Sequence, residues 1–353
     1  MITHINIDRR IIGLGYPAYI IAELSANHQQ QFDEAVKLVT LAKEAGADAV
    51  KLQTYTPDTL TIKSNRPEFK IDGTLWNGKT LHNLYEEAYT PWDWQPELKN
   101  IADSLGIALF SSAFDTTAVD FLEKMNVPAY KVASFELVDT PLIKYIASKG
   151  KPVIMSTGMA TLSEIEEAVV TARSGGTSQV ALLKCTSSYP ALPEEMNLRT
   201  IPHLAQAFNV PVGLSDHTLG TAIPVTAVAL GACIVEKHFT LSRSNQTPDS
   251  AFSLEPDEFK AMVDAVRIAE KALGEVRYDV SEEEVKSRVL RRSLFAVKNI
   301  KAGEKFTSNN VRSIRPGYGL HPRYINQILG KKSVIEIKKG SPLSWDLIDR
   351  RNT

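Results

Sequence analysis

Two short stretches decide the predicted fold: Gly213-Leu214-Ser215-Asp216-His217-Thr218 and, further along, Glu236-Lys237-His238. Each histidine closes a short apolar run, Val210–Leu214 in the first case and Ala232–Val235 in the second. If both runs are parallel strands, the two imidazoles emerge at carboxyl ends, where barrel and open α/β enzymes place their chemistry. The residues between them are small and apolar, and they are numerous enough for one crossover helix. The pattern predicts two histidines that could share one divalent metal ion.

The same alternation of strand and helix extends outward along most of the chain. Eight β-rich runs are each followed by a helical pattern, and they are Ala18–Leu24, Asp48–Gln53, Ile107–Ser111, Ala129–Ser134, Pro152–Ser156, Val180–Cys185, Val210–Leu214 and Ala232–Lys237. Eight such units in about 275 residues fit a TIM barrel in count and length. A doubly wound sheet is the alternative, but no Gly-x-Gly-x-x-Gly follows the first run. We therefore predict an α/β fold with a (β/α)8 TIM barrel.

The alternation stops at Gly274, which ends a last helical pattern that begins at Pro256. The highly charged residues 278–292 predict a linker with a short helix from Ser281. Short strands and turns follow, among them Ser293–Val297 and Ser333–Ile337. The predicted organisation is a barrel over 1–277, a linker over 278–292 and a small, mostly β domain over 293–353, whose core would be modest by itself.

Composition and charge narrow the function classes. The 353 residues are 43% apolar and 23% charged, with a formal net charge of −1, so neither nucleic acid nor a membrane surface is an expected partner. No apolar run reaches the roughly 18 residues of a membrane span, and the first ten residues lack the apolar core of a signal peptide. Cys185 and Cys233 are predicted to be reduced core thiols, which fits a cytoplasmic setting.

Polar side chains stand at the end of every predicted strand. In chain order they include Glu23, Asn27, His28, Lys51, Gln53, Ser111, Ser112, Lys131, Ser134, Ser156, Thr157, Lys184, Thr186, Ser187, Ser188, Ser215, Asp216, His217, Glu236, Lys237 and His238. Lysines and hydroxyls that converge at one barrel mouth would bind a phosphate or carboxylate. A single strand-end lysine fits a solvated or salt-bridged role equally well, and it is the convergence that favours a ligand role.

Three of these positions suggest metal chemistry. His217 and His238 are candidate ligands, with Glu23 as a base or as the partner of a metal-bound water. Either histidine alone could instead be a hydrogen-bonded structural residue. Asp249 could support the metal ligands from behind or bind a sugar hydroxyl, and it could equally be a plain turn residue. The connection from Thr54 to Trp92 is unusually long, and it suits either substrate contacts or a surface excursion packed on the barrel.

Together these motifs resemble the sialic acid synthase family. The matching stretches are Glu23 with Asn27-His28, Lys51-Leu52-Gln53, Tyr130 to Ser134, Ser156 to Met159, Gly213 to Thr218 and Glu236 to Phe239. Lys298 to Gly319, with Arg315-Pro316-Gly317, is similar to that family's carboxyl-terminal antifreeze-like (SAF) domain. The resemblance covers nearly the whole chain.

The resemblance implies a transferase that condenses phosphoenolpyruvate with an acetamido sugar, releasing phosphate by C–O cleavage with the help of a divalent metal. It implies that His217 and His238 bind Mn²⁺, with Mg²⁺ or Co²⁺ possible, and that Glu23 handles protons. Phosphoenolpyruvate would contact Lys51, Ser112, Lys131, Ser134, Ser156, Ser187 and Ser215. The sugar would contact Gln53, Tyr189, Asp249 and Arg315, the last from the partner subunit of a domain-swapped homodimer.

Within the family, the long second loop looks most like the branch that makes pseudaminic acid from 2,4-diacetamido-2,4,6-trideoxy-L-altrose. Ala133–Glu136 and Glu194–Leu198 point the same way. We hypothesise that Tyr85, Tyr89, Phe135 and Tyr189 form an apolar wall for the sugar's methyl and acetyl groups. The alternatives are N-acetylmannosamine or the legionaminic acid precursor as the sugar, or a non-catalytic barrel used for binding or assembly. A metal-dependent aldolase or phosphatase would share the histidines but leave the small domain and Arg315 unexplained.

The chain also departs from the family pattern in its loops. Gln29-Gln30-Gln31 follow His28 where the family usually has a glycine, and Ser111–Phe114 lacks an expected proline. Asn245–Thr247 replaces a glycine-rich turn before Asp249. None of these changes falls on a predicted metal or phosphate ligand.

Overall fold

The computed structural model describes residues 4–349. Residues 1–3 and 350–353, the outermost ends of the two predicted domains, lie outside the described part. The chain divides into two compact units, of which the first ends at Gly274 and the second begins at Glu275.

The first unit is a closed barrel of eight parallel strands, which confirms the predicted TIM-barrel fold. The strands are β3 (Tyr19–Glu23), β4 (Ala49–Thr54), β5 (Ala108–Ala113), β6 (Tyr130–Val132), β7 (Val153–Ser156), β8 (Val180–Cys185), β9 (Val212–Asp216) and β10 (Ile234–His238). They pair in sequence order, and β10 closes the barrel against β3. The carboxyl ends of all eight strands therefore meet at one mouth, where the predicted site residues of the barrel stand.

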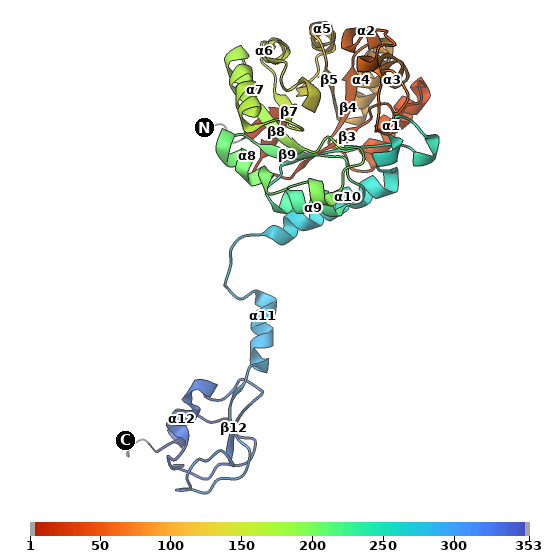
Figure 1. The fold of residues 1–353 in the computed structure, drawn as a ribbon. Coiled ribbons are helices and arrows are strands. Elements are labelled where there is room, and N and C mark those ends of the chain that lie inside the picture. Colours follow the sequence, from red (N-terminus) through yellow and green to blue (C-terminus); the bar gives the residue numbers. More distant parts are fainter. Residues whose placement is uncertain (1–3, 350–353) are drawn as a thin grey trace. The chain divides into compact units, whose positions relative to one another are not determined.

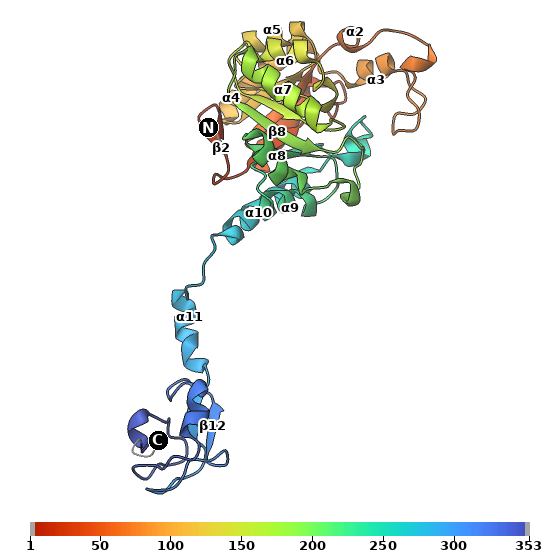
Figure 2. The same ribbon diagram turned by 60° about the vertical axis from the view of Figure 1, so that its left-hand side comes forward.

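Helices surround the strands in the two views of this unit (Figures 1 and 2). They are α1 (Phe32–Glu44), α4 (Gln95–Leu105), α5 (Thr116–Lys124), α6 (Thr140–Ala147), α7 (Leu162–Gly175), α8 (Thr200–Phe208), α9 (Ala222–Ala229) and α10 (Pro256–Leu273). Local signals fix their ends: Thr161 and Glu164 form the predicted capping box of α7, and Pro256 begins α10. Each helix with an apolar stripe turns it toward the strands, as Phe259, Met262 and Val266 of α10 do.

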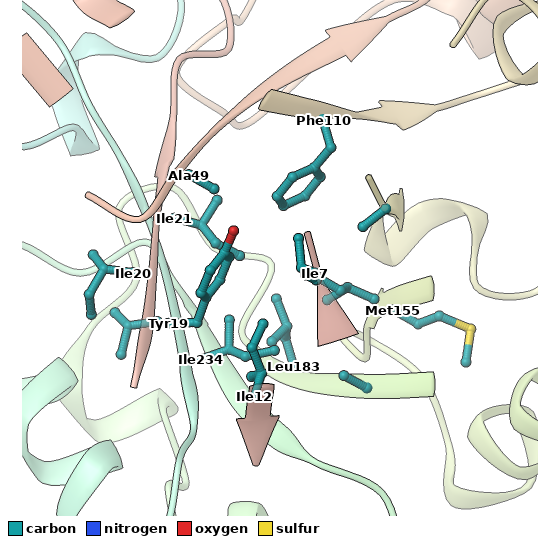
Figure 3. Close-up of a cluster of buried hydrophobic side chains, with 14 of the residues drawn as sticks. Ile7, Ile12, Tyr19, Ile20, Ile21, Ala49, Phe110, Met155, Leu183 and Ile234 are labelled. Carbon is teal, nitrogen blue, oxygen red and sulfur yellow. The ribbon is translucent and has the colours of Figure 1, made fainter. Parts of the chain in front are cut away.

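A hairpin that sequence analysis did not predict closes the other end of the barrel. It consists of β1 (His4–Ile7) and β2 (Arg10–Gly13), paired antiparallel. Ile7 and Ile12 are fully buried against residues at the starts of the strands, including Tyr19 and Ile234 (Figure 3). The amino-terminal end of the barrel is therefore an apolar plug.

The long connection after β4 contains two short helices, α2 (Pro57–Leu60) and α3 (Leu81–Ala88). Between them, an isolated bridge joins Lys70 to Thr80. The indole of Trp76 donates a hydrogen bond of 2.9 Å to the carbonyl of Pro248, in the loop after β10. The loop thus packs on the mouth of the barrel.

The first helix of the second unit is α11 (Glu282–Ser287), which has Ser281 as its N-cap and lies where the short helix was predicted. It also contains β11 (Ser293–Ala296), β12 (Val311–Ile314) and α12 (Ile325–Ile328) around a small core that includes Leu294 and Phe306. The predicted strand Ser333–Ile337 is wrong, since its two end residues form only isolated bridges with Ile348 and Ile300. Within residues 4–349, no helix is both long and apolar enough to cross a membrane.

Candidate active site

Two lysines and two glutamates form a buried charge cluster at the barrel mouth. Lys51 Nζ, at the end of β4, lies 2.7 Å from Glu23 Oε2 of β3 and 3.3 Å from Glu236 Oε1 of β10. Lys131 Nζ of β6 lies 3.9 Å from the same Glu236 oxygen. All four side chains are almost completely buried. Because alternate strand residues face the barrel interior, strands far apart in the sequence deliver these charges to one place.

Hydroxyl groups surround the cluster. Lys51 donates to Ser112 Oγ at 3.3 Å, and Lys131 donates to Ser156 Oγ at 2.7 Å. Ser215 Oγ donates to Glu236 Oε1 at 3.1 Å. The structure therefore brings together five of the seven residues predicted to bind phosphoenolpyruvate.

The other two predicted hydroxyls lie beside Gly158, in the turn after β7. Gly158 N donates to Ser134 Oγ at 3.1 Å. A Cβ on Gly158 would come within 2.2 Å of Ser187 Oγ and 2.7 Å of Ser134 Oγ, so only glycine fits here. Ser187 Oγ is buried without a hydrogen-bond partner. This free donor and the adjacent backbone make a polar pocket wall.

Burial and neighbouring charges shift the pKa values of the cluster in opposite directions. Burial raises the pKa of Glu23 to about 7, although Lys51 opposes the shift. Burial lowers the pKa of Lys131 to about 8. For Glu236 burial is outweighed by Lys131 and Lys51, which hold its pKa below the ordinary value. The mouth thus contains one carboxyl able to carry a proton near neutrality and one held ionised.

A further carboxyl, Glu136, follows β6. Its Oε2 atom is buried without a hydrogen-bond partner, and burial raises its pKa to about 7. It is a second group able to hold or release a proton near neutral pH.

The two histidines stand side by side at the ends of β9 and β10, with ring centroids 5.3 Å apart. The carbonyl of Thr186 accepts a hydrogen bond of 2.9 Å from His217 Nδ1, which leaves Nε2 of that ring with its lone pair. His238 Nδ1 is buried without a hydrogen-bond partner and lies 4.0 Å from Asp249 Oδ2. Burial lowers the pKa of His238 well below its usual value, so this imidazole is neutral. Neutral imidazoles with free nitrogens are what a divalent metal requires.

Cys185 is more than a core thiol. It is a buried free thiol close to His217. Burial, which would raise its pKa, is outweighed by the contacts with His217 and Ser134, so the pKa of the thiol falls to about 7. The same contact with Cys185 outweighs burial at His217 and raises the pKa of its imidazole.

The predicted sugar residues of the barrel lie next to this histidine pair. Gln53 Nε2 donates to Glu23 Oε1 at 3.0 Å and to Ser25 Oγ at 2.9 Å. Ser25 Oγ in turn donates to Asp249. Gln53 and Asp249 are thereby linked in one polar chain to Glu23. Arg315 directly follows β12 in the second unit.

Aromatic rings line the histidine side of the mouth. Tyr189 lies with its ring centroid 4.4 Å from that of His217, 5.1 Å from Phe252 and 5.7 Å from Trp76. Of the other residues in the predicted apolar wall, Tyr85 contacts Tyr55 instead. Phe135 is 61% exposed. Trp76 and Phe252 thus join Tyr189 in the wall that the structure presents.

Three strand-end residues named in the sequence serve the scaffold. Lys237 points out of the barrel and pairs with Asp216 at 2.6 Å, with both side chains fully buried. Asn27 donates to the carbonyl of Phe239, and His28 lies 3.1 Å from the Thr90 hydroxyl. The alternation of strand residues separates Lys237 from Glu236 and His238.

Glu236 was placed at a strand end but given no role, and Ser25, Phe252 and Glu136 were not among the predicted site residues. For Glu236 a signal existed: it stands two positions before His238 on one strand, so both must face the interior.

No metal-type cluster of three or more His, Cys, Asp or Glu side chains occurs within residues 4–349.

The chain belongs to the NeuB family, whose match covers residues 38–278, and a SAF domain matches residues 291–349. This confirms the resemblance to sialic acid synthases. The chain is 48% identical to the pseudaminic acid synthase of Campylobacter jejuni, over 97% of this chain and 98% of that protein. It is 38% identical to the N,N'-diacetyllegionaminic acid synthase of the same species, over 88% and 94%. The crystal structure of the Bacillus subtilis spore coat polysaccharide biosynthesis protein SpsE superimposes with a TM-score of 0.67 at 33% identity, covering 99% of this chain and all of that one.

Proposed function

We propose that this protein condenses phosphoenolpyruvate with 2,4-diacetamido-2,4,6-trideoxy-L-altrose to give pseudaminic acid and phosphate. The observation that carries the proposal is the buried pair Lys51 and Lys131, with serine hydroxyls around it, at the same mouth as His217 and His238. Ammoniums and hydroxyls suit a small anion that bears both phosphate and carboxylate.

The donor set fits a divalent metal. His238 would hold it through a neutral imidazole whose Nδ1 already lacks a partner, and His217 would hold it once its own ring is deprotonated. With two protein imidazoles, the remaining ligands would come from water or substrate. When bound, Mn²⁺ or a similar ion would polarise the sugar aldehyde as a Lewis acid.

The residues of the chain account for the other requirements. Lys51 and Lys131 hold the phosphate and carboxylate so that C3 of phosphoenolpyruvate faces the aldehyde carbon. A C–C bond forms between these atoms, and the aldehyde oxygen takes up a proton. Positive charge develops at C2, which water attacks, and the C2–O bond then breaks so that phosphate leaves and a keto acid remains. Glu23, with its pKa of about 7, can accept or donate the protons of these steps.

Two observations favour the pseudaminic branch over the other sugars. The identity to the pseudaminic acid synthase is ten percentage points above that to the legionaminic acid synthase from the same species. The rings of Trp76, Tyr189 and Phe252 form an apolar surface next to the histidines, which suits a 6-deoxy sugar with acetyl groups. Arg315 as a sugar contact, and the domain-swapped homodimer that would supply it, stay predictions.

The test is phosphate release from phosphoenolpyruvate with Mn²⁺, in parallel with the diacetamido-trideoxy-altrose, N-acetylmannosamine and the legionaminic acid precursor. We expect turnover with the altrose sugar. Preference for another sugar would keep the chemistry and overturn the branch. No release with any sugar, in folded and metal-replete protein, would favour the non-catalytic barrel.

A further inference from the structure

Glu236 is a buried charged residue that the mechanism above does not use. Its Oε1 atom faces Lys51 at 3.3 Å and Lys131 at 3.9 Å, and it accepts a hydrogen bond from Ser215 at 3.1 Å. Its Oε2 atom is buried without a hydrogen-bond partner. The residues that contact this carboxylate are the same residues proposed to hold phosphoenolpyruvate.

A permanent carboxylate at this position works against anion binding. Lys51 and Lys131 bring two positive charges and Glu236 a permanent negative one, and all three side chains are almost completely buried. A phosphate that enters must share the lysines with Glu236 and accept repulsion from it, since low solvent access leaves these charges poorly screened. A site built only for tight anion binding would have an apolar or amide side chain here.

We propose that Glu236 is a counter-charge that competes with phosphate for Lys51 and Lys131 and so promotes release of the phosphate product. With the site empty, Glu236 holds both lysine side chains in the barrel mouth and compensates their charge. With phosphate bound, it limits the affinity, and when phosphate leaves it provides the lysines with a replacement partner. Glu236 is thus a positioning residue that acts through the lysines. This inference rests on the proposed function for the identity of the anion.

The central comparison is Glu236→Gln, which has the same shape and keeps an oxygen to accept from Ser215 but lacks the charge. Calorimetric titration with inorganic phosphate, on full-length protein with Mn²⁺ present, should show binding about tenfold tighter than in the wild type. Product inhibition by phosphate should strengthen by the same factor, whereas the KM for the sugar should not change. A merely structural role would not tighten phosphate binding.

Two further variants control for charge elsewhere and for misfolding. Glu123→Gln removes a carboxylate that also pairs with a lysine, Lys151 at 3.2 Å, but lies before β6 at the other end of the barrel, so phosphate affinity should stay at the wild-type value. If Glu236→Gln does not fold, Glu236→Asp and Glu236→Asn provide a second pair of equal size that differs in charge. The asparagine variant should bind phosphate about tenfold more tightly than the aspartate variant.

The outcomes separate this inference from the proposed function. If the wild type turns over phosphoenolpyruvate but the uncharged variants bind phosphate equally or more weakly, the counter-charge role is wrong and the synthase function stands. If the wild type does not turn over phosphoenolpyruvate and neither it nor Glu236→Gln binds phosphate, both the counter-charge role and the phosphoenolpyruvate site are wrong.

Discussion

The two ends of the barrel are built from the same eight strands but by opposite rules. At the amino-terminal end, Ile7 and Ile12 of the hairpin complete an apolar layer (Figure 3). At the carboxyl end, Lys51, Lys131 and Glu236 are equally buried but charged. Burying apolar side chains stabilises the fold, whereas burying charges costs free energy unless they are paired. Stability is therefore expected to come mainly from the amino-terminal end of the barrel, and chemistry from the carboxyl end.

The largest expected effect is at the histidine pair. His238→Gln should lower kcat/KM by about 10³-fold, because it removes a proposed ligand of the metal that would act as the Lewis acid. A chelator should abolish the activity of the wild type, and added Mn²⁺ should restore it in the wild type but not in the variant. Bound metal measured by elemental analysis should fall in parallel. The exposed His203, changed to glutamine, is the control, and an effect of similar size there would contradict the assignment.

The next largest effect tests the contribution of the amino-terminal end of the barrel to stability. Ile12→Ala should lower the free energy of unfolding by about 2–4 kcal/mol, because it opens a cavity in the apolar plug. The neighbouring Ile11 is 37% exposed, so Ile11→Ala should cost much less. Urea unfolding measures both, and steady-state kinetics at 25 °C should show unchanged KM values. A selective loss of phosphoenolpyruvate affinity in Ile12→Ala would break the division between the ends.

Lys131→Met tests the same division at the mouth. The KM for phosphoenolpyruvate should rise by about 10²-fold, since the variant loses one of the two lysines proposed to hold this anion. The free energy of unfolding should fall by less than in Ile12→Ala, because burial makes the lysine charge costly, lowering its pKa to about 8, and Lys51 still pairs with Glu236. Lys151→Met, at a more exposed lysine, should leave both quantities unchanged. Marked destabilisation by Lys131→Met would show that the mouth also supports the fold.

Glu23 gives a smaller effect with a defined sign. Its pKa is near 4.5 in the unfolded chain and about 7 in the folded protein. Between these values the folded state keeps a proton that the unfolded state has lost, so the free energy of unfolding falls as pH rises through this window. Glu23→Gln should flatten this fall by at most about 1.4 kcal/mol per pH unit. Glu136, with a similar pKa, should retain part of the slope. Parallel curves for the two proteins in urea unfolding at pH 5, 6 and 7 would contradict the shift.

The smallest effect concerns the rim of the mouth, where glutamines replace the expected glycine. Gln29 and Gln30 both have positive φ, at 52° and 54°. Gln29→Gly should therefore stabilise the protein by up to about 1 kcal/mol. Gln30→Gly should gain less, because the Gln30 side chain donates to the carbonyls of Glu87 and Tyr89. Equal or opposite shifts in thermal unfolding would show that the left-handed backbone is not what sets this cost.

The sequence predicts features that are local and misses those that depend on pairing at a distance. All eight strands were predicted because each is a short apolar run with its own helix signals. The hairpin was missed because each of its strands has only four residues, and Ile7 and Ile12 become core only by covering the end of the barrel. Ser333–Ile337 is the opposite case. Its local pattern resembles a strand, but its partners in the fold allow only single bridges.

The candidate site divides in the same way. Residue types at strand ends identified His217 and His238, because position along a strand fixes which face a side chain takes. The sequence could not show that Glu236 contacts lysines from two other strands. Nor could it show that Trp76 reaches the loop at Pro248, since that contact joins segments 172 residues apart.

The most direct test of the central claim is a single turnover assay with Mn²⁺, the diacetamido-trideoxy-altrose and phosphoenolpyruvate labelled with ¹⁸O at the bridging oxygen. The reaction should release phosphate that contains the label, because the C2–O bond of phosphoenolpyruvate breaks. Phosphate without the label, or no phosphate from folded and metal-replete protein, would contradict the assignment of the buried lysines and histidines to this reaction.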